Sequence, residues 1–137
     1  MRKLLRVNPS RGAAKEEEPP KKIALDYVGG RGFGSKYLYD EVPAGTDPLG
    51  KQNKLMIGPG LLAGTGAQSL SKWMVYTKSP LTGTFTRNCG GGDFGAWLKW
   101  AGFELVIFEG KAAKPAYLYI KDGTCEILDA QDIWGKT

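Results

Sequence analysis

The sequence contains no histidine and only two cysteines, Cys89 and Cys125, among its 137 residues. Without histidine, the chain lacks the base of Ser-His and Cys-His nucleophile pairs and the commonest ligand of transition metals. The two cysteines are far apart and form no C-x-x-C pattern, which excludes a disulfide framework, a zinc site and a four-cysteine iron–sulfur cluster within this chain. We therefore expect free thiols and no histidine-based chemistry.

The sequence also lacks long hydrophobic runs. No apolar stretch approaches the roughly 20 residues that a membrane-spanning helix needs, and the basic and apolar start, MRKLLRV, is followed by no cleavage pattern of small residues. An apolar fraction of 42% beside 24% charged residues is typical of a globular protein and excludes a disordered chain. We expect a single soluble domain over residues 1–137, located in the cytoplasm and independent of membranes.

The net charge of +5 is scattered along the chain and forms neither a basic block nor a stripe. Aromatic residues within Trp73–Tyr76 would suit base stacking, but ordinary sheets carry such residues too. We interpret the lysine and arginine side chains as solvated surface and predict no nucleic-acid partner.

Strand and helix patterns alternate along the chain without an internal repeat or a linker. Turn residues, apolar residues spaced four apart and alternating or continuous apolar runs mark the elements. They predict a hairpin over residues 3–18, helices from Ile23 to Val28 and from near Ser35 to Val42, strands over Lys54–Ile57, Trp73–Lys78 and Leu105–Phe108, a further strand that begins at Thr84–Thr86, and a hairpin that joins Tyr117–Lys121 to Thr124–Leu128 through Asp122-Gly123. Because the run at Leu105–Phe108 is continuously apolar, we expect it to be covered on both faces.

The clearest helix is expected over Asp93–Ala101. Phe94, Trp97 and Leu98 follow the i, i+3, i+4 spacing of one buried face. Asp93 can cap the start of this helix, and Gly102 can close its end. The pattern predicts that the inner face of the helix is aromatic.

Three glycine clusters compete as ligand sites. The first, GGRGFG at 29–34, lies between two predicted helices and is interpreted as a turn that needs positive φ, although Arg31 within it could bind an anion. The second, at 58–63, fits the G-x-G-x-x-A dinucleotide fingerprint. Two further glycines interrupt the helix that should follow it, and no acidic residue stands near the end of the next strand. A nucleotide site is therefore not expected there.

The third cluster, Gly90–Gly92, immediately precedes the predicted helix. Three consecutive glycines lose much conformational entropy on folding, so their presence suggests a need for bare backbone. The unpaired N–H groups and positive dipole at a helix start suit a phosphate or a polar heterocycle. The alternative is a structural turn in which the Asp93 carboxylate caps the same N–H groups and repels a phosphate that no divalent cation bridges. Cys89 beside the cluster is either a stabilised thiolate or, without a base, a packing residue.

Seven segments together carry a family resemblance. They are LLRVN at 4–8, YVGGRGFGSKYLYDEVP at 27–43, DPLGKQNKLMI at 47–57, GPGLLAGTGA at 58–67, YTKSPLTG at 76–83, GGGDFGAWLKWAGFELVIFEGKAAKPAYLYIKDG at 90–123 and DAQDIWGK at 129–136. In order and spacing they resemble the N-terminal domain of the aldehyde ferredoxin oxidoreductases, over essentially the whole chain. The resemblance implies an α+β fold of mixed β-sheets with a few short helices, truncated relative to the family.

The resemblance also implies a tungsten or molybdenum bis-pterin cofactor, shared with domains that are missing here, whose phosphates magnesium bridges. In this chain it assigns the cofactor contacts to Lys72, Asn88, Cys89, Gly90, Gly91 and Gly92, and it assigns no catalytic residue. The family carries arginine where this chain has Lys72, which keeps the charge but loses the bidentate fork. The family's asparagine, the expected contact to magnesium, corresponds to Asn88 by residue type and to Cys89 by counting from the preceding segment.

Enzymes of this family are several times longer than the chain, and their iron–sulfur cysteines and acid–base residues lie beyond the matched region. One hypothesis is a cofactor-binding fragment or split subunit of a pterin-dependent oxidoreductase that acts on aldehydes or related substrates. Its partners would be the remaining domains or subunits and a ferredoxin-like electron carrier. The alternative is a non-catalytic module that, when isolated, forms a homo-oligomer or binds a partner through apolar surface. On either hypothesis, this chain alone is not expected to turn over aldehyde.

Overall fold

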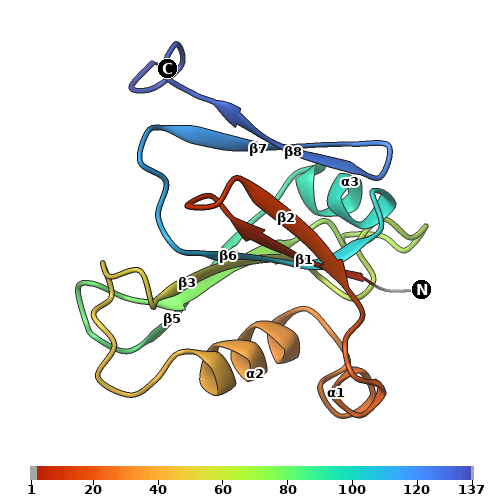
Figure 1. Cartoon of the computed structure of the whole chain (residues 1–137). Coiled ribbons are helices and arrows are strands. Elements are labelled where there is room, and N and C mark those ends of the chain that lie inside the picture. The colour runs from red at the N-terminus through yellow and green to blue at the C-terminus, as the bar shows by residue number, and fades with distance from the viewer. Residues whose placement is uncertain (1–2, 137) are drawn as a thin grey trace.

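The computed structural model describes residues 3–136, which form three short helices and eight strands in two sheets (Figure 1). The helices are α1 (Lys21–Tyr27), α2 (Arg31–Glu41) and α3 (Phe94–Trp100), and the strands are β1 (Lys3–Asn8), β2 (Ala13–Glu17), β3 (Lys54–Pro59), β4 (Trp73–Lys78), β5 (Phe85–Gly90), β6 (Phe103–Glu109), β7 (Ala116–Lys121) and β8 (Thr124–Asp129). This mixture confirms the predicted α+β class. The predicted domain limits, residues 1 and 137, lie outside the described residues. No helix between residues 3 and 136 is long and apolar enough to cross a membrane.

The larger sheet has the strand order β2-β1-β6-β3-β4-β5, and the smaller sheet is the hairpin β7-β8. β1 and β6 run parallel, whereas the other neighbouring pairs of the larger sheet are antiparallel. Helix α2 covers one face of this sheet, and α3 and the β7–β8 hairpin lie on the opposite face (Figure 1). The sheet thus separates two cores.

Strand β6 contributes to both cores, as its continuous apolar run predicts. Leu105 and Ile107 pack beneath α2 together with Tyr76, while Val106 packs on the opposite face together with Leu98 of α3. Burying an aliphatic side chain of this size stabilises the fold by about 1.5–3 kcal/mol relative to leaving it in water. The prediction that this strand is covered on both faces is confirmed.

Both predicted hairpins are present. β1 and β2 pair antiparallel, and Gly12 in their connection has a φ of 62°. In the β7–β8 turn, Asp122 and Gly123 have φ values of 48° and 79°, which is the positive-φ pair that a two-residue hairpin turn requires. Turn chemistry alone was therefore sufficient to place both hairpins.

Helix α2 begins at Arg31, earlier than the start near Ser35 that the sequence predicted. The turn before it uses positive φ only at Gly29 and Gly30 within the first glycine cluster, with values of 134° and 49°. Gly34 lies inside the helix, where an added Cβ would come within 2.4 Å of the Tyr76 ring. The later glycines of the cluster belong to the helix, where Gly34 lies close to the sheet and a Cβ on Gly32 would meet the Tyr27 backbone. These tertiary contacts have no signature in the glycine pattern.

Strand β5 extends well beyond the beginning that the sequence indicated. The sequence indicated only its beginning at Thr84–Thr86, but β5 runs to Gly90 and pairs with β4 along its whole length. Asn88 and Cys89 therefore belong to a strand and not to a loop before α3. β5 forms one edge of the larger sheet.

Five charged side chains connect five elements at one place in the fold. This set, the Arg6 cluster, consists of Arg6, Glu17, Glu41, Lys54 and Glu109. Arg6 lies 2.7 Å from Glu17, 2.8 Å from Glu41 and 3.4 Å from Glu109, and Lys54 lies 2.6 Å from Glu41 and 3.1 Å from Glu109. All five side chains are less than a third exposed, which makes these pairs less screened than ordinary surface pairs.

The Arg6 cluster should make the stability depend on pH. Burial would raise the pKa of Glu41 and Glu109, but hydrogen bonds and attraction from Arg6 and Lys54 outweigh burial and hold both pKa values below the ordinary 4.5. A carboxyl group whose pKa is lower in the folded chain stabilises the fold above its unfolded pKa, and this contribution is lost as the pH falls through the folded pKa. In urea titrations we expect a constant midpoint above about pH 5.5 and a falling one below about pH 4.5. Glu41→Gln should flatten this fall, and an equally steep fall in that variant would contradict the assignment.

Candidate functional site

Three segments meet at one end of the larger sheet. β3 ends at Pro59, β4 begins at Trp73 and β5 ends at Gly90, and these three residues are aligned across the sheet. The N–H of Gly60 donates a hydrogen bond to the carbonyl of Lys72 at 2.9 Å. We call Gly60, Lys72, Gly90, Gly91 and Gly92 the glycine end of the sheet. The fold thus brings Lys72 next to the third glycine cluster.

The three consecutive glycines have different surroundings. A Cβ at Gly90 would lie 2.5 Å from the indole ring of Trp73, whose N–H donates to the carbonyl of Gly91 at 3.0 Å. Packing against Trp73 therefore explains the missing side chain at Gly90. At Gly91 and Gly92 an added Cβ would meet no atom within 4 Å, and Gly92 has a φ of 80°. Bare backbone faces open space only at these last two glycines of the cluster.

The carboxylate of Asp93 does not cap helix α3. Asp93 has helical backbone angles, with a φ of −83°, and its side chain makes no capping hydrogen bond. The prediction that Asp93 caps this helix is therefore wrong. As a result, its carboxylate does not block the open backbone at Gly91 and Gly92.

Asn88 and Cys89 lie on opposite faces of the sheet. Successive side chains of a strand alternate between faces. Cys89 is paired with Met74, which packs on the core beneath α2, whereas Asn88 is paired with Val75 and shares the α3 face with Gly90. Both side chains are exposed. A ligand on one face of the sheet can therefore contact only one of these two side chains.

Cys89 should react with thiol reagents faster than Cys125. Cys89 is exposed and Cys125 is half-buried, and burial, with a smaller contribution from Glu16, raises the pKa of the Cys125 thiol. A higher pKa lowers the thiolate fraction at a given pH, and one unit reduces it about tenfold. We expect brief alkylation near pH 8, followed by mass spectrometry, to modify Cys89 first. Cys89→Ser should abolish the fast phase, and persistence of that phase would contradict the assignment.

The start of helix α2 also lies close to the glycine end. A Cβ on Gly30 would lie 3.3 Å from the Pro59 carbonyl oxygen and 3.6 Å from the Cα of Gly60.

The α2 face of the sheet also carries two arginines near Tyr76. Burial raises the pKa of Tyr76 to about 12, and the positive charges of Arg87 and Arg31 partly oppose this shift. Both arginines are exposed and therefore add positive charge to the α2 face.

The second glycine cluster forms a turn and does not open a helix. The chain after β3 turns at residues 61–64, and β3 is antiparallel to both of its neighbours. The dinucleotide fingerprint thus lacks the parallel strand and helix that it needs. The helix that the sequence already showed to be interrupted is absent here.

Sequence reasoning missed three residues that hold this turn. Lys99 and Trp100 of α3 donate hydrogen bonds to carbonyls of the turn, and Glu104 of β6 pairs with Lys99. One signal was present in the sequence, since Glu104 directly precedes the apolar run Leu105–Phe108. A carboxylate that is buried with such a run needs a cation as its partner.

Helix α3 exposes aromatic side chains that the sequence predicted to be buried. Phe94, Trp97 and Trp100 are 46%, 64% and 68% exposed, while Leu98 is buried. We call these three aromatic residues the aromatic shelf. The prediction is wrong for Phe94 and Trp97 because the β7–β8 hairpin leaves their side of this short helix uncovered.

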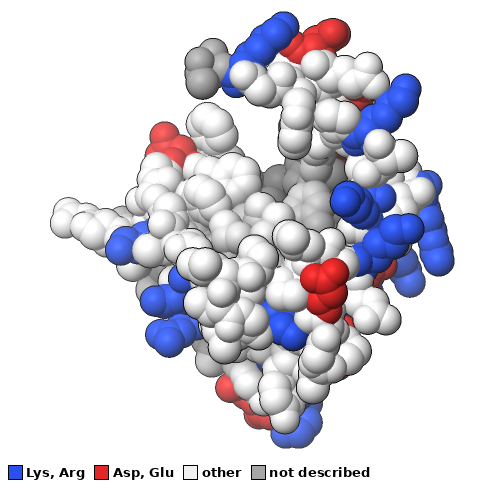
Figure 2. Space-filling model, turned by 90° about the vertical axis from the view of Figure 1, so that its left-hand side faces the viewer, with Lys and Arg blue, Asp and Glu red and all other residues white. Residues whose placement is uncertain are grey.

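An apolar cavity of about 420 Å³ lies between α3, β6 and β7, beside the aromatic shelf. A hollow beneath the β7–β8 hairpin is visible in Figure 2, with mainly uncharged side chains at its lower margin. Exposed apolar surface of this kind is available for contact with a partner or a ligand.

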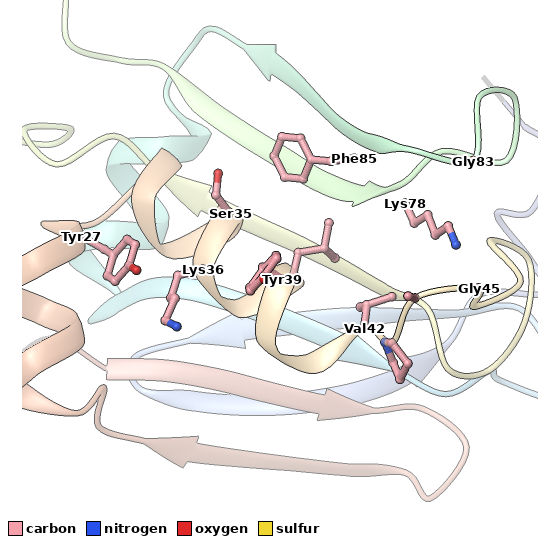
Figure 3. A pocket seen from close by; sticks show the side chains of 12 residues that line it. Tyr27, Ser35, Lys36, Tyr39, Val42, Gly45, Lys78, Gly83 and Phe85 are labelled. Carbon is pink, nitrogen blue, oxygen red and sulfur yellow. The ribbon is translucent and has the colours of Figure 1, made fainter.

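A larger cavity, of about 730 Å³, lies at the opposite end of β4 and β5, between these strands and α2. Figure 3 shows Tyr39 and Lys36 of α2 on one side of it and Phe85 of β5 on the other. Its two lysines are engaged, since Lys36 pairs with Asp40 and Lys78 donates to the carbonyl of Thr46. The cavity contains none of the predicted site residues.

The glycine end offers open backbone beside a positive charge. It combines open backbone at Gly91 and Gly92 with the exposed ammonium of Lys72, which has no hydrogen-bond or ion-pair partner among residues 3–136. Between these same residue limits, no three histidine, cysteine, aspartate or glutamate side chains converge as a metal site.

Sequence comparisons place the chain among much longer proteins. It matches the family described as "Aldehyde ferredoxin oxidoreductase, N-terminal domain" over residues 4–137. It is 47% identical over 134 residues to the "Tungsten-containing aldehyde ferredoxin oxidoreductase" of Pyrococcus furiosus, a match that covers 98% of this chain and 22% of the relative. It is 37% identical over 136 residues to the "Aliphatic sulfonate oxidoreductase, WOR-like subunit" of the same organism, with 97% and 22% covered. The chain thus spans about a fifth of the length of these relatives.

A solved structure has the same fold. A chain of the "Active site complex BamBC of Benzoyl Coenzyme A reductase in complex with 1,5 Dienoyl-CoA" superposes with a TM-score of 0.94 at 34% identity. The match covers 97% of this chain and 20% of that chain. Sequence and structure comparisons therefore agree that nearly all of this chain corresponds to a small part of each larger protein.

Proposed function

Because the chain belongs to the aldehyde ferredoxin oxidoreductase family, whose N-terminal domain it matches, we propose that it forms one wall of a tungsten or molybdenum bis-pterin site in a cytoplasmic oxidoreductase. The substrates are aldehydes or related compounds, and electrons pass to a ferredoxin-like iron–sulfur protein. Residues 1–137 act as one domain, and the remaining domains or subunits complete the enzyme, since the relatives are about five times longer. When bound, the cofactor supplies the redox chemistry, while this chain binds and orients it.

The open backbone at Gly91 and Gly92 is the observation that carries this proposal. A pterin presents polar ring edges and a phosphate, both of which accept hydrogen bonds from backbone N–H groups that no side chain screens. The Lys72 ammonium, at the adjacent strand start, binds the phosphate as a point charge. Gly90 has a supporting role, because it lets Trp73 pack beneath the two open glycines.

Of the two alternatives for the magnesium contact, the geometry favours Asn88. Its carboxamide oxygen is a hard ligand of the kind that magnesium accepts, and its side chain is on the α3 face with Gly90. Cys89 lies on the α2 face, and its sulfur is a poor ligand for magnesium. Cys89 can contact the cofactor only from that opposite face.

Metal and pterin analysis tests the proposed function. The gene region that encodes the chain is expressed together with the reading frame that follows, and the purified product is analysed for tungsten, molybdenum and pterin. We expect stoichiometric metal and pterin in the wild type and about tenfold lower retention in Lys72→Met. Lys72→Arg should retain the cofactor, and Lys51→Met, an exposed lysine in another loop, serves as the control. A wild-type product without metal and pterin would overturn the proposal.

The aromatic shelf supports a second candidate function, a self-associating or partner-binding module. The isolated chain leaves Phe94, Trp97 and Trp100 uncovered, and such surface promotes association. Sedimentation of the isolated chain should therefore show a homo-oligomer that Trp97→Gln weakens. A monomer at all concentrations would remove this candidate, while an oligomer that dissociates on adding the remaining domains would favour the cofactor role.

A further inference from the structure

The last turn of helix α3 holds the loop between β3 and β4. The ammonium of Lys99 lies 2.6 Å from the carbonyl oxygen of Leu61, 3.3 Å from that of Gly60 and 3.0 Å from the Glu104 carboxylate. The side chain of Lys99 is 17% exposed and that of Glu104 is 4% exposed. Since an ammonium has three N–H donors, these three acceptors engage all of them.

A second attachment lies one residue further along the helix. The indole N–H of Trp100 donates to the carbonyl of Gly64 at 2.9 Å. Gly64 has a φ of 74°, and an added Cβ there would lie 2.8 Å from the indole nitrogen. We call Lys99, Trp100 and Glu104 the α3 clamp. Adjacent side chains of the helix thus fix both ends of the turn at residues 60–64.

The same turn and helix enclose the backbone of Lys72. On one side, the N–H of Gly60 donates to the Lys72 carbonyl at 2.9 Å. On the other side, the first turn of α3 is so close that a Cβ at Gly95 would lie 3.4 Å from the same oxygen. These two contacts hold the backbone of Lys72. They therefore fix the position from which its exposed side chain extends.

The charges of the α3 clamp are internal and are not available to a ligand. Burying an ammonium and a carboxylate costs solvation that their attraction offsets only in a well-defined arrangement. A loop that must become ordered when a ligand arrives weakens binding, whereas a loop that is ordered beforehand does not. The Lys99–Glu104 pair is worth its solvation cost if it holds the loop at residues 60–64 in one geometry.

We propose that Lys99, Glu104 and Trp100 are positioning residues of the cofactor site. They hold the turn at residues 60–64, and through Gly60 they hold Lys72, in the arrangement that the cofactor meets. This inference rests on the proposed function of Lys72. It assigns no contact between the α3 clamp and the cofactor itself.

Hydrogen exchange of the co-expressed complex tests the structural part of the inference. Lys99→Met combined with Glu104→Gln removes both charges of the pair, and Trp100→Phe removes the indole N–H while keeping a smaller aromatic ring at this exposed position. In both variants we expect the amides of residues 60–72 to exchange about tenfold faster, with the amides of β6 unchanged. Lys51→Met should alter neither segment.

Two outcomes would overturn the inference. Equal acceleration of exchange in β6 would mean general destabilisation, and unchanged exchange at residues 60–72 would mean that the α3 clamp does not hold this loop. Trp100→Phe decides the matter where the double variant fails to fold, because its ring is exposed.

Cofactor retention tests the functional part. Tungsten, molybdenum and pterin are measured during dialysis of the complex, and we expect the clamp variants to lose them about tenfold faster than the wild type. Adding Lys72→Met to a clamp variant should cause little further loss, because both changes act on one contact. Wild-type retention in both clamp variants would overturn the inference and leave the proposed function intact. Absence of metal and pterin from the wild-type complex would overturn both, and this outcome is recognised without any variant.

Discussion

Replacing Arg6 with methionine is expected to lower the free energy of unfolding by about 3 kcal/mol, at the lower end of the range for breaking a desolvated ion pair. Arg6 alone contacts three carboxylates, those of Glu17, Glu41 and Glu109. Without it, Lys54 still pairs with Glu41 and Glu109, whereas Glu17 has no other cation partner among residues 3–136. Methionine keeps an apolar stem of similar reach, so the measured loss reports the charge and its hydrogen bonds. Urea denaturation at neutral pH measures this effect.

Two variants separate the effect of the Arg6 cluster from general effects of charge. Lys3→Met removes a cation from the same strand whose partner, Glu16, is exposed, so the urea midpoint should barely change. Arg6→Lys keeps the charge but replaces the five-donor guanidinium fork with a three-donor ammonium, and it should give an intermediate loss. If Arg6→Met shifts the midpoint no further than Lys3→Met, the cluster does not stabilise the fold.

Gly34→Ala is expected to destabilise the chain by about 2 kcal/mol, against the usual preference for alanine in helices. Alanine in place of glycine inside a helix normally stabilises by about 1 kcal/mol. At Gly34, however, the new Cβ would lie 2.4–2.5 Å from ring atoms of Tyr76, which is completely buried. The helix would have to move away from β4. Thermal and urea unfolding both measure the loss.

A smaller residue at position 76 should relieve this clash. In the Tyr76→Leu background, Gly34→Ala should cost less than it does in the wild type, because the ring that it meets is gone. Gly66→Ala is the matched control, since a Cβ there meets no atom within 4 Å and its φ is not positive. Additive effects of Gly34→Ala and Tyr76→Leu would show that the ring is not the obstacle.

Local patterns predicted most of the elements. The apolar run of β6, the Asp122-Gly123 turn and the glycine that ends α3 appear where the sequence placed them, because each depends on a few neighbouring residues. The predicted start of α2 was wrong, and the sequence predicted no end for β5. The first depends on how closely Gly34 approaches Tyr76, and the second on pairing with β4, so neither is encoded in the residues next to the boundary.

The candidate site shows the same division between local and long-range information. The three glycines were recognised from sequence as a place for bare backbone, but their roles differ, since Trp73 fills the space at Gly90 and leaves only Gly91 and Gly92 open. The sequence left Asn88 and Cys89 as alternatives, and the pleat of β5 puts them on opposite faces. The α3 clamp, which joins residues from three separate segments, had only the weak signal of a carboxylate beside an apolar run.

By itself the sequence determined the α+β class, the two hairpins, the family and the absence of histidine chemistry, because composition, turn residues and ordered motifs are properties of the chain before it folds. Only the tertiary structure decided which glycines stay uncovered, which face each strand residue takes and which charges are buried together. These properties depend on packing and desolvation between segments that lie far apart in the sequence, where one neighbouring ring or one strand register changes the outcome.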